Sequence, residues 1–196
     1  MTAFVDRALE SAGLRDVLDA RRAPPLPEAM MERLRAADLL MLGALADRIR
    51  RDEVGDEVRI YIGEPPAPDA LTTVLPEIGS DVTGLELLRQ VAFARVTAAT
   101  AMRVRIDWTR CGMELAQVAL GFGADELCGL ITSKAGMLIS SDELLGIGKK
   151  SRRESARLVK QRELADCVRR SGRIPVVVGF EGVAEDALHP FVQDSP

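Results

Sequence analysis

The sequence has few of the residues that metal sites and acid-base catalytic sites commonly use. Its 196 residues include one histidine, three cysteines, one tryptophan and one tyrosine. Cys111, Cys128 and Cys167 are too widely spaced for the close cysteine pairs of a zinc site or a disulfide framework. We therefore expect reduced thiols, no bound metal and no resident cofactor. His189 lies in the C-terminal stretch, which argues against a catalytic dyad or triad built on histidine.

The chain also lacks long apolar runs and a strong excess of one charge. No segment approaches the roughly 20 apolar residues of a membrane-spanning helix, and the first residues do not have the charged-then-apolar profile of a signal peptide. With 26 Lys and Arg against 30 Asp and Glu, the net charge is -4, which gives no general attraction to nucleic acid or to an anionic membrane. We therefore expect a cytoplasmic protein that binds neither.

Residues 1–196 are expected to form a single domain, because 47% hydrophobic residues are enough for one sizeable core. Residues 1–56 are expected to be helical, residues 57–178 to alternate strands with helices, and residues 179–196 to form a tail. Strands that alternate with helices of this length pair in parallel through right-handed crossovers. The pattern therefore predicts the α/β class.

The individual elements follow from periodicity, caps and prolines. Helices are expected at residues 3–21, 28–51 with a break near Asp38, 83–97, 115–122 and 162–170. Strands are expected at residues 57–62, 71–75, 102–108, 127–131 and 174–178. Thr83 and Glu86 have the spacing of a capping box, and the prolines of GEPPAPDA indicate a linker. The apolar run IPVVV is typical of a buried strand.

Four segments occur in the same order as in one enzyme family. They are VTGLELLRQVAFARV, MRVRIDW, GMELAQVALGFGADELCG and ADCVRRSGRIPVVV. Over roughly Asp81 to Val178, they resemble the C-terminal half of the radical S-adenosylmethionine (radical SAM) enzymes that include aminofutalosine synthase, dehypoxanthine futalosine cyclase and FO synthase. Leu39 to Ile62 resembles the segment that leads into the first barrel strand of that family. The resemblance implies a partial, half TIM-like barrel of about four or five mainly parallel strands, with a helical N-terminal extension.

The chain departs from the family pattern at the cluster loop. In the family, a Cys-x3-Cys-x2-Cys loop after the first strand holds a [4Fe-4S] cluster through its thiolates. Here Ile62 runs directly into GEPPAPDA, and no cysteine precedes Cys111. We therefore expect a truncated homologue without an iron-sulfur cluster, which cannot perform radical chemistry alone. The resemblance implies a link to menaquinone (futalosine) or deazaflavin-type cofactor biosynthesis.

A partial barrel leaves two sheet edges with unpaired backbone groups. The N-terminal helices could cover one edge, the sheet could open into a flat α/β layer, or a second chain could complete the cylinder. The last alternative predicts a homo-oligomer, or a heteromer with an intact radical SAM homologue. The sequence leaves edge coverage and closure by a second chain both open.

The strand MRVRIDW carries a candidate binding site. Charged and apolar residues alternate along it, so one face of the strand is polar. Residues at the carboxyl end of a barrel strand line the active face. The ligand-binding candidates are Arg105, Asp107, Trp108, Thr109 and Arg110. One interpretation is a pocket for a polar small molecule; the other is an internal Arg-Asp ion pair or a solvated sheet edge.

Two further segments carry candidate groups. The anion-binding or partner-binding candidates are Lys149, Lys150, Arg152 and Arg153, and the alternative for them is a solvated loop. Cys111 is expected at the start of a helix, where a thiol pKa can be lowered, but no neighbouring base identifies it as a nucleophile. Asp125 and Glu126 are adjacent in sequence, so their side chains need not converge.

These observations predict a non-catalytic, radical-SAM-like partial barrel that acts as a partner subunit or binds a small metabolite. The alternative is a cluster-free enzyme that uses Arg105, Asp107 and Arg110 on a small polar substrate at the carboxyl ends of the strands. A third interpretation is a remnant with a stable fold and no selected activity. A shielded pocket would favour the enzyme, and an exposed apolar edge would favour the partner subunit.

Overall fold

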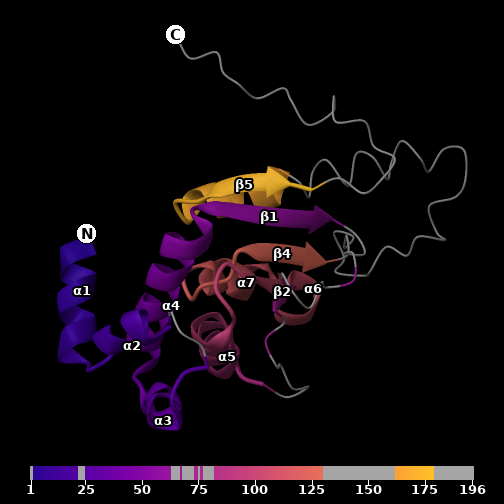
Figure 1. Ribbon diagram of the computed structural model, residues 1–196. Coiled ribbons are helices and arrows are strands. Elements are labelled where there is room, and N and C mark those ends of the chain that lie inside the picture. The colour runs from indigo at the N-terminus through magenta and orange to yellow at the C-terminus, as the bar shows by residue number, and fades with distance from the viewer. Residues whose placement is uncertain are drawn as a thin grey trace, which may run out of the picture.

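The computed structural model describes residues 2–21, 25–62, 67, 73–74, 76, 82–129 and 162–178. Its five strands are β1 (Glu57–Ile62), β2 (Thr73–Val74), β3 (Arg103–Asp107), β4 (Glu126–Gly129) and β5 (Ile174–Val177). They form one open sheet in the order β2-β3-β4-β1-β5, and every pair is parallel (Figure 1). The α/β class and the five parallel strands are therefore confirmed.

The helices confirm the helical N-terminal part and the local signals that predicted them. They are α1 (Thr2–Ser11), α2 (Arg15–Ala20), α3 (Glu28–Ala36), α4 (Leu39–Val54), α5 (Gly84–Thr97), α6 (Trp108–Cys111), α7 (Met113–Leu120) and a further helix over residues 162–170. Asp38 separates α3 from α4 because its side chain accepts hydrogen bonds from the first backbone N–H groups of α4. Thr83 and Glu86 form the expected capping box at the start of α5.

The strand order differs from that of consecutive barrel strands, which are neighbours in space. Here β1 lies between β4 and β5, and the sheet is not closed. The steps from β2 to β3, from β3 to β4 and from β4 to β5 all move across the sheet in the same direction. Right-handed crossovers in one direction place the connecting helices on one face. This rule accounts for the position of α5, α7 and the helix over residues 162–170 on the same side of the sheet.

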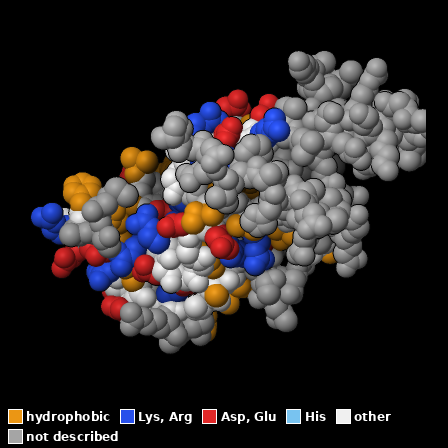
Figure 2. All heavy atoms as spheres, turned by 90° about the horizontal axis from the view of Figure 1, so that it is seen from above, with side chains coloured by type: hydrophobic (Ala, Val, Ile, Leu, Met, Phe, Trp, Pro, Cys, Tyr) orange, Lys and Arg blue, Asp and Glu red, His pale blue; other side chains and the backbone are white. Residues whose placement is uncertain are grey.

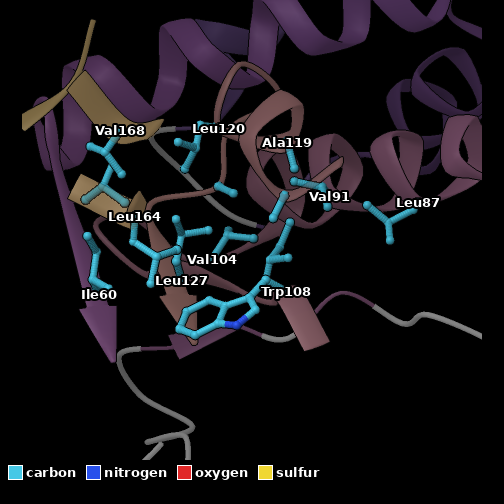
Figure 3. Close-up of a cluster of buried hydrophobic side chains, with 14 of the residues drawn as sticks. Ile60, Leu87, Val91, Val104, Trp108, Ala119, Leu120, Leu127, Leu164 and Val168 are labelled. Carbon is cyan, nitrogen blue, oxygen red and sulfur yellow. The ribbon is translucent and has the colours of Figure 1, made fainter. Parts of the chain in front are cut away.

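The main core lies between the sheet and these helices (Figure 3). Alternate residues of the central strands point into it: Val58, Ile60, Val104, Ile106 and Leu127. Their partners from the helices include Leu88, Val91, Ala119, Leu164 and Val168. Full burial of a side chain of this size stabilises the fold by roughly 1.5–3 kcal/mol. The period-two pattern of the strands therefore determines which of their residues face away from the helices.

A second core joins the N-terminal helices to the rest. It is formed by Leu42, Leu45 and Ile49 of α4, Ala92 and Val96 of α5, and Leu9, Leu14, Val17 and Leu34 of the preceding segments. In Figure 1, α4 lies at the end of the sheet where β1 and β5 begin. Helix α4 thus lies at the amino ends of these two strands.

Buried arginines form ion pairs at this end of the sheet. Arg21 pairs with Glu53 of α4 at 2.7 Å and donates a hydrogen bond to the carbonyl of Ala98 after α5. Arg173, directly before β5, pairs with Asp47 of α4. In parallel barrels and sheets of this kind, the amino end serves stability and the carboxyl end serves function.

The interpretation of IPVVV as a buried strand is wrong. Ile174 is 58% exposed and the rest of β5 is half-buried, because β5 is an edge strand with only β1 beside it among the described strands. An apolar run fits a buried central strand and an edge strand equally well when the partner on one side is unknown.

Candidate functional site

The face of the sheet opposite the main core is polar. The residues that alternate with the core positions include Arg105 on β3, Glu126 and Cys128 on β4, and Arg59 and Tyr61 on β1. Strand register aligns them, since Glu126 pairs with Arg105 on one side and with Arg59 on the other. We call the set Arg59, Arg105, Glu126 and Tyr61 the polar ladder. The predicted polar face of β3 is confirmed, and it continues across two further strands.

Glu126 is the centre of the polar ladder. It is 1% exposed and accepts a hydrogen bond from Nε of Arg105 at 2.9 Å. A guanidinium nitrogen of Arg59 lies 3.6 Å from its other oxygen. Two guanidinium groups therefore share one carboxylate, which stabilises a charge that burial alone would make costly.

Arg105 is held from a second side by an aromatic ring. Its guanidinium carbon lies 4.9 Å from the ring centroid of Tyr61, within the range of a cation-π contact. Both side chains are buried, at 5% and 8% exposure. The geometry fixes Arg105 between a carboxylate and a ring, so its orientation is set before any ligand arrives.

The loop after β3 holds the other predicted ligand-binding residues. The carboxylate of Asp107 accepts a hydrogen bond from the backbone N–H of Thr109 at 2.8 Å and caps α6. Trp108 is 3% exposed and packs in the main core, away from the polar face, whereas Arg110 is exposed. The internal ion pair that involves Arg105 is made with Glu126, and Asp107 acts as a helix cap.

Gly129 allows this loop to sit against the end of β4. A Cβ atom at this position would lie 2.5 Å from Cε2 of Trp108 and 2.7 Å from the hydroxyl oxygen of Thr109. Only glycine leaves room for such a close approach. The short helix α6 is therefore packed directly against the carboxyl end of β4, with Trp108 in the main core.

The cysteines are not activated nucleophiles in this structure. Cys111 is the last residue of α6, and burial, together with the nearby charge of Asp107, raises its pKa to about 11. Burial likewise raises the pKa of Cys128 to about 12. The expectation that a helix start could lower the pKa of Cys111 is wrong, because burial and a neighbouring carboxylate outweigh any helix effect at this position.

Asp125 and Glu126 point to different clusters. Asp125 is fully buried, pairs with Arg95 and Arg103, and accepts a hydrogen bond from the backbone N–H of Val104 at 2.7 Å. Burial raises the pKa of the Asp125 carboxyl and lowers the pKa of the Arg95 guanidinium, while the opposite charge of each partner acts against the effect of burial. The two adjacent acids therefore have different roles. Asp125 links α5 to the start of β3 through its ion pairs and hydrogen bond, and Glu126 belongs to the polar face.

Several candidate features lie elsewhere. Lys149, Lys150, Arg152 and Arg153 fall outside the described residues. Within the described residues, no group of three or more His, Cys, Asp and Glu side chains could hold a metal, and no helix is long and apolar enough to cross a membrane.

A pocket of about 250 Å³ lies between α2 and α4, and its charged lining includes the Arg21–Glu53 and Arg48–Asp52 ion pairs. On the surface in Figure 2, acidic and basic side chains are interspersed.

Reasoning from single strands missed three members of the polar ladder. Arg59 and Tyr61 alternate with core residues in EVRIYI as Arg105 does in MRVRIDW, so the signal was present in the sequence. Glu126 gave no such signal, because its role depends on lying between β3 and β1. Strand order was the missing information.

Comparison with known proteins supports the resemblance over part of the chain. No protein-family model matches. A segment of 96 residues is 30% identical to the cyclic dehypoxanthine futalosine synthase of Streptomyces coelicolor. This half of the chain is similar to that enzyme. The match covers 49% of the chain and 21% of the Streptomyces protein, so the chain spans about a fifth of the length of the relative. The resemblance to this radical SAM group is confirmed to that extent.

Proposed function

We propose that the chain is a non-catalytic protein that binds a small polar metabolite at the polar face of its sheet. The observation that carries this proposal is the polar ladder, in which Arg105 and Glu126 are buried and hold each other in place on the face of the sheet opposite the main core. Polar groups that are fixed in position and shielded from water are typical of ligand sites. Their orientation is established before binding, which lowers the entropic cost of association.

The described residues argue for binding over catalysis. The thiols of Cys111 and Cys128 have raised pKa values, and Asp107 is engaged as a helix cap. Glu126 is held by two arginines. Within the described part of the chain, no nucleophile lies beside a base that would activate it. The cluster-free enzyme is therefore the less favoured alternative.

The name of the Streptomyces relative supplies a candidate ligand. That protein is a synthase of cyclic dehypoxanthine futalosine, and we extend the futalosine class to this chain together with the link to menaquinone biosynthesis. Isothermal titration of the full chain with dehypoxanthine futalosine and with its cyclic product is the test. We expect saturable binding and unchanged ligand after prolonged incubation, as judged by mass spectrometry.

A matched pair of variants sharpens that test. Glu126→Gln removes the central negative charge of the polar ladder, which releases Arg105 from its ion pair, and is expected to change the binding affinity. Glu28→Gln makes the same change at an exposed ion pair on α3 and is expected to leave binding unchanged. Absence of binding to either compound would refute the metabolite proposal, and turnover of either would favour the enzyme.

A second candidate is the partner subunit, as a homo-oligomer or beside an intact radical SAM homologue. It rests on the expectation that a second chain covers the unpaired backbone groups of an open sheet edge. The β5 side opposes it. Ile174 and Val178 donate their backbone N–H groups toward β1, so the backbone groups of Pro175 and Val177 point away from β1. Pro175 has no N–H group to donate to a further strand.

Light scattering distinguishes this candidate. We expect a monomer for the chain alone and no mixed complex with the intact homologue from the same source. A stable dimer or mixed complex would support the partner subunit and direct attention to the β2 edge.

A further inference from the structure

Arg59 differs from the other arginines of the sheet in how it is held. Its guanidinium lies 3.6 Å from Glu126, longer than a hydrogen bond, and its side chain is 43% exposed. Arg105 already donates to the same carboxylate at 2.9 Å and is 5% exposed. Glu126 is thus neutralised chiefly by Arg105, and Arg59 keeps a cationic group that an incoming ligand can reach.

The residues beside Arg59 on the edge strand are apolar. Register aligns Arg59 with Val176, and Glu57 with Ile174. Aligned residues of parallel strands project to the same face, so Ile174 and Val176 lie on the polar face next to Arg59. Ile174 is 58% exposed and Val176 is half-buried. Arg59 therefore stands at a boundary, with an apolar strip on one side and the polar ladder on the other.

We infer that Arg59, Val176 and Ile174 bind a carboxylate that is attached to an apolar ring or chain. The inference rests on the proposed binding function and names the ligand class for the same face. A planar carboxylate matches the fork of the guanidinium, and the apolar body of the ligand covers Ile174 and Val176. Glu57, which is exposed on the same face, repels a second negative charge and so favours a carboxylate over a phosphate dianion.

Simple probes test this inference in the full chain. Ligand-observed NMR titrations would use benzoate, its neutral analogue benzamide, and phenyl phosphate. Benzoate is expected to bind more tightly than either of the others. Arg59→Gln should weaken benzoate binding by about 10-fold to 100-fold, the range for a lost charge-assisted hydrogen bond, and should leave benzamide almost unaffected.

Matched variants separate the site from general charge effects. Arg33→Gln removes an arginine that is 45% exposed on α3 and pairs with Asp16, and it should leave benzoate binding unchanged. Arg59→Lys should retain part of the affinity because it keeps the charge. Ile174→Ser should weaken benzoate and benzamide alike. The inference is overturned if none of the probes binds, if Arg59→Gln binds benzoate as the wild type does, or if Arg33→Gln loses as much affinity.

Its failure is distinguishable from failure of the proposed function. If dehypoxanthine futalosine binds equally well to the wild type and to Arg59→Gln, the metabolite proposal stands and the role of Arg59 is rejected. If benzoate binds through Arg59 but the futalosine derivatives do not bind, the carboxylate site stands and the futalosine ligand is rejected.

Discussion

Asp125 offers a quantitative test of how this fold is held together. Its carboxylate is fully buried and engages Arg95, Arg103 and the backbone of Val104. Arg95 is also fully buried and donates to the carbonyl of Gly123 at 2.8 Å. The cluster joins three successive parts of the chain: α5, the start of β3 and the turn before β4.

Asp125→Ala should destabilise the protein strongly. The substitution leaves the buried guanidinium of Arg95 without its carboxylate partner, and removal of one member of a buried ion pair typically costs about 3–5 kcal/mol. The free energy of unfolding of an ordinary domain is about 5–15 kcal/mol. The variant is therefore expected to lose a large share of its stability while the surface exposed on unfolding stays the same.

Urea unfolding followed by circular dichroism measures the loss. The midpoint should fall with no change in the slope of the free energy against urea. Glu28→Ala is the matched control, because it removes an acid from a pair with Arg35 whose side chains are 72% and 54% exposed. Such a pair is worth about 0–1 kcal/mol.

A double-mutant cycle gives the refuting result. Arg95→Met removes the buried cation, so the double variant Arg95→Met/Asp125→Ala should cost less than the sum of the two single variants. If Asp125→Ala costs no more than Glu28→Ala, or if the two single effects add, the cluster does not hold the sheet in the way described.

Three further outcomes are expected. In the folded protein, thiol reagents should modify Cys111 and Cys128 slowly at pH 8, because their pKa values are raised above the ordinary thiol value of 9.0. The stability that these protonated thiols contribute is present below about pH 9. It should decline in unfolding measurements as the pH rises toward 11. Gly129→Ala should cost about 1–3 kcal/mol from overpacking against Trp108, which thermal unfolding would detect, and a loss below 0.5 kcal/mol would contradict the close approach. Thr83→Ala should remove the cap of α5 and cost about 1 kcal/mol, with an unchanged melting temperature as the contrary result.

Local chemistry made much of the secondary structure predictable. The cap at Asp38, the capping box at Thr83 and the period-two pattern of MRVRIDW each act within a few residues, and the structure shows all three. The polar face of β3 was predictable for the same reason. What the pattern could not supply was the partner of Arg105, which is a residue 21 positions away on another strand.

The candidate site was only partly predictable because its members come from three strands. Trp108 was a candidate because it stands at the carboxyl end of the strand, yet it packs in the main core. This position follows from the alternation itself, since Val104, Ile106 and Trp108 all face the main core.

By itself, the sequence determined the α/β class, the helical N-terminal part, the helix caps and the polar side of β3, because these depend on interactions between residues close in the chain. The tertiary structure decided that β1 lies between β4 and β5, that Glu126 is shared by Arg59 and Arg105, and that β5 is an edge strand. These features depend on strand order and register, which are fixed by the burial of side chains from distant segments. The physical reason for the division is that hydrogen bonds and caps act locally, whereas the packing of a core selects among topologies that share the same local pattern.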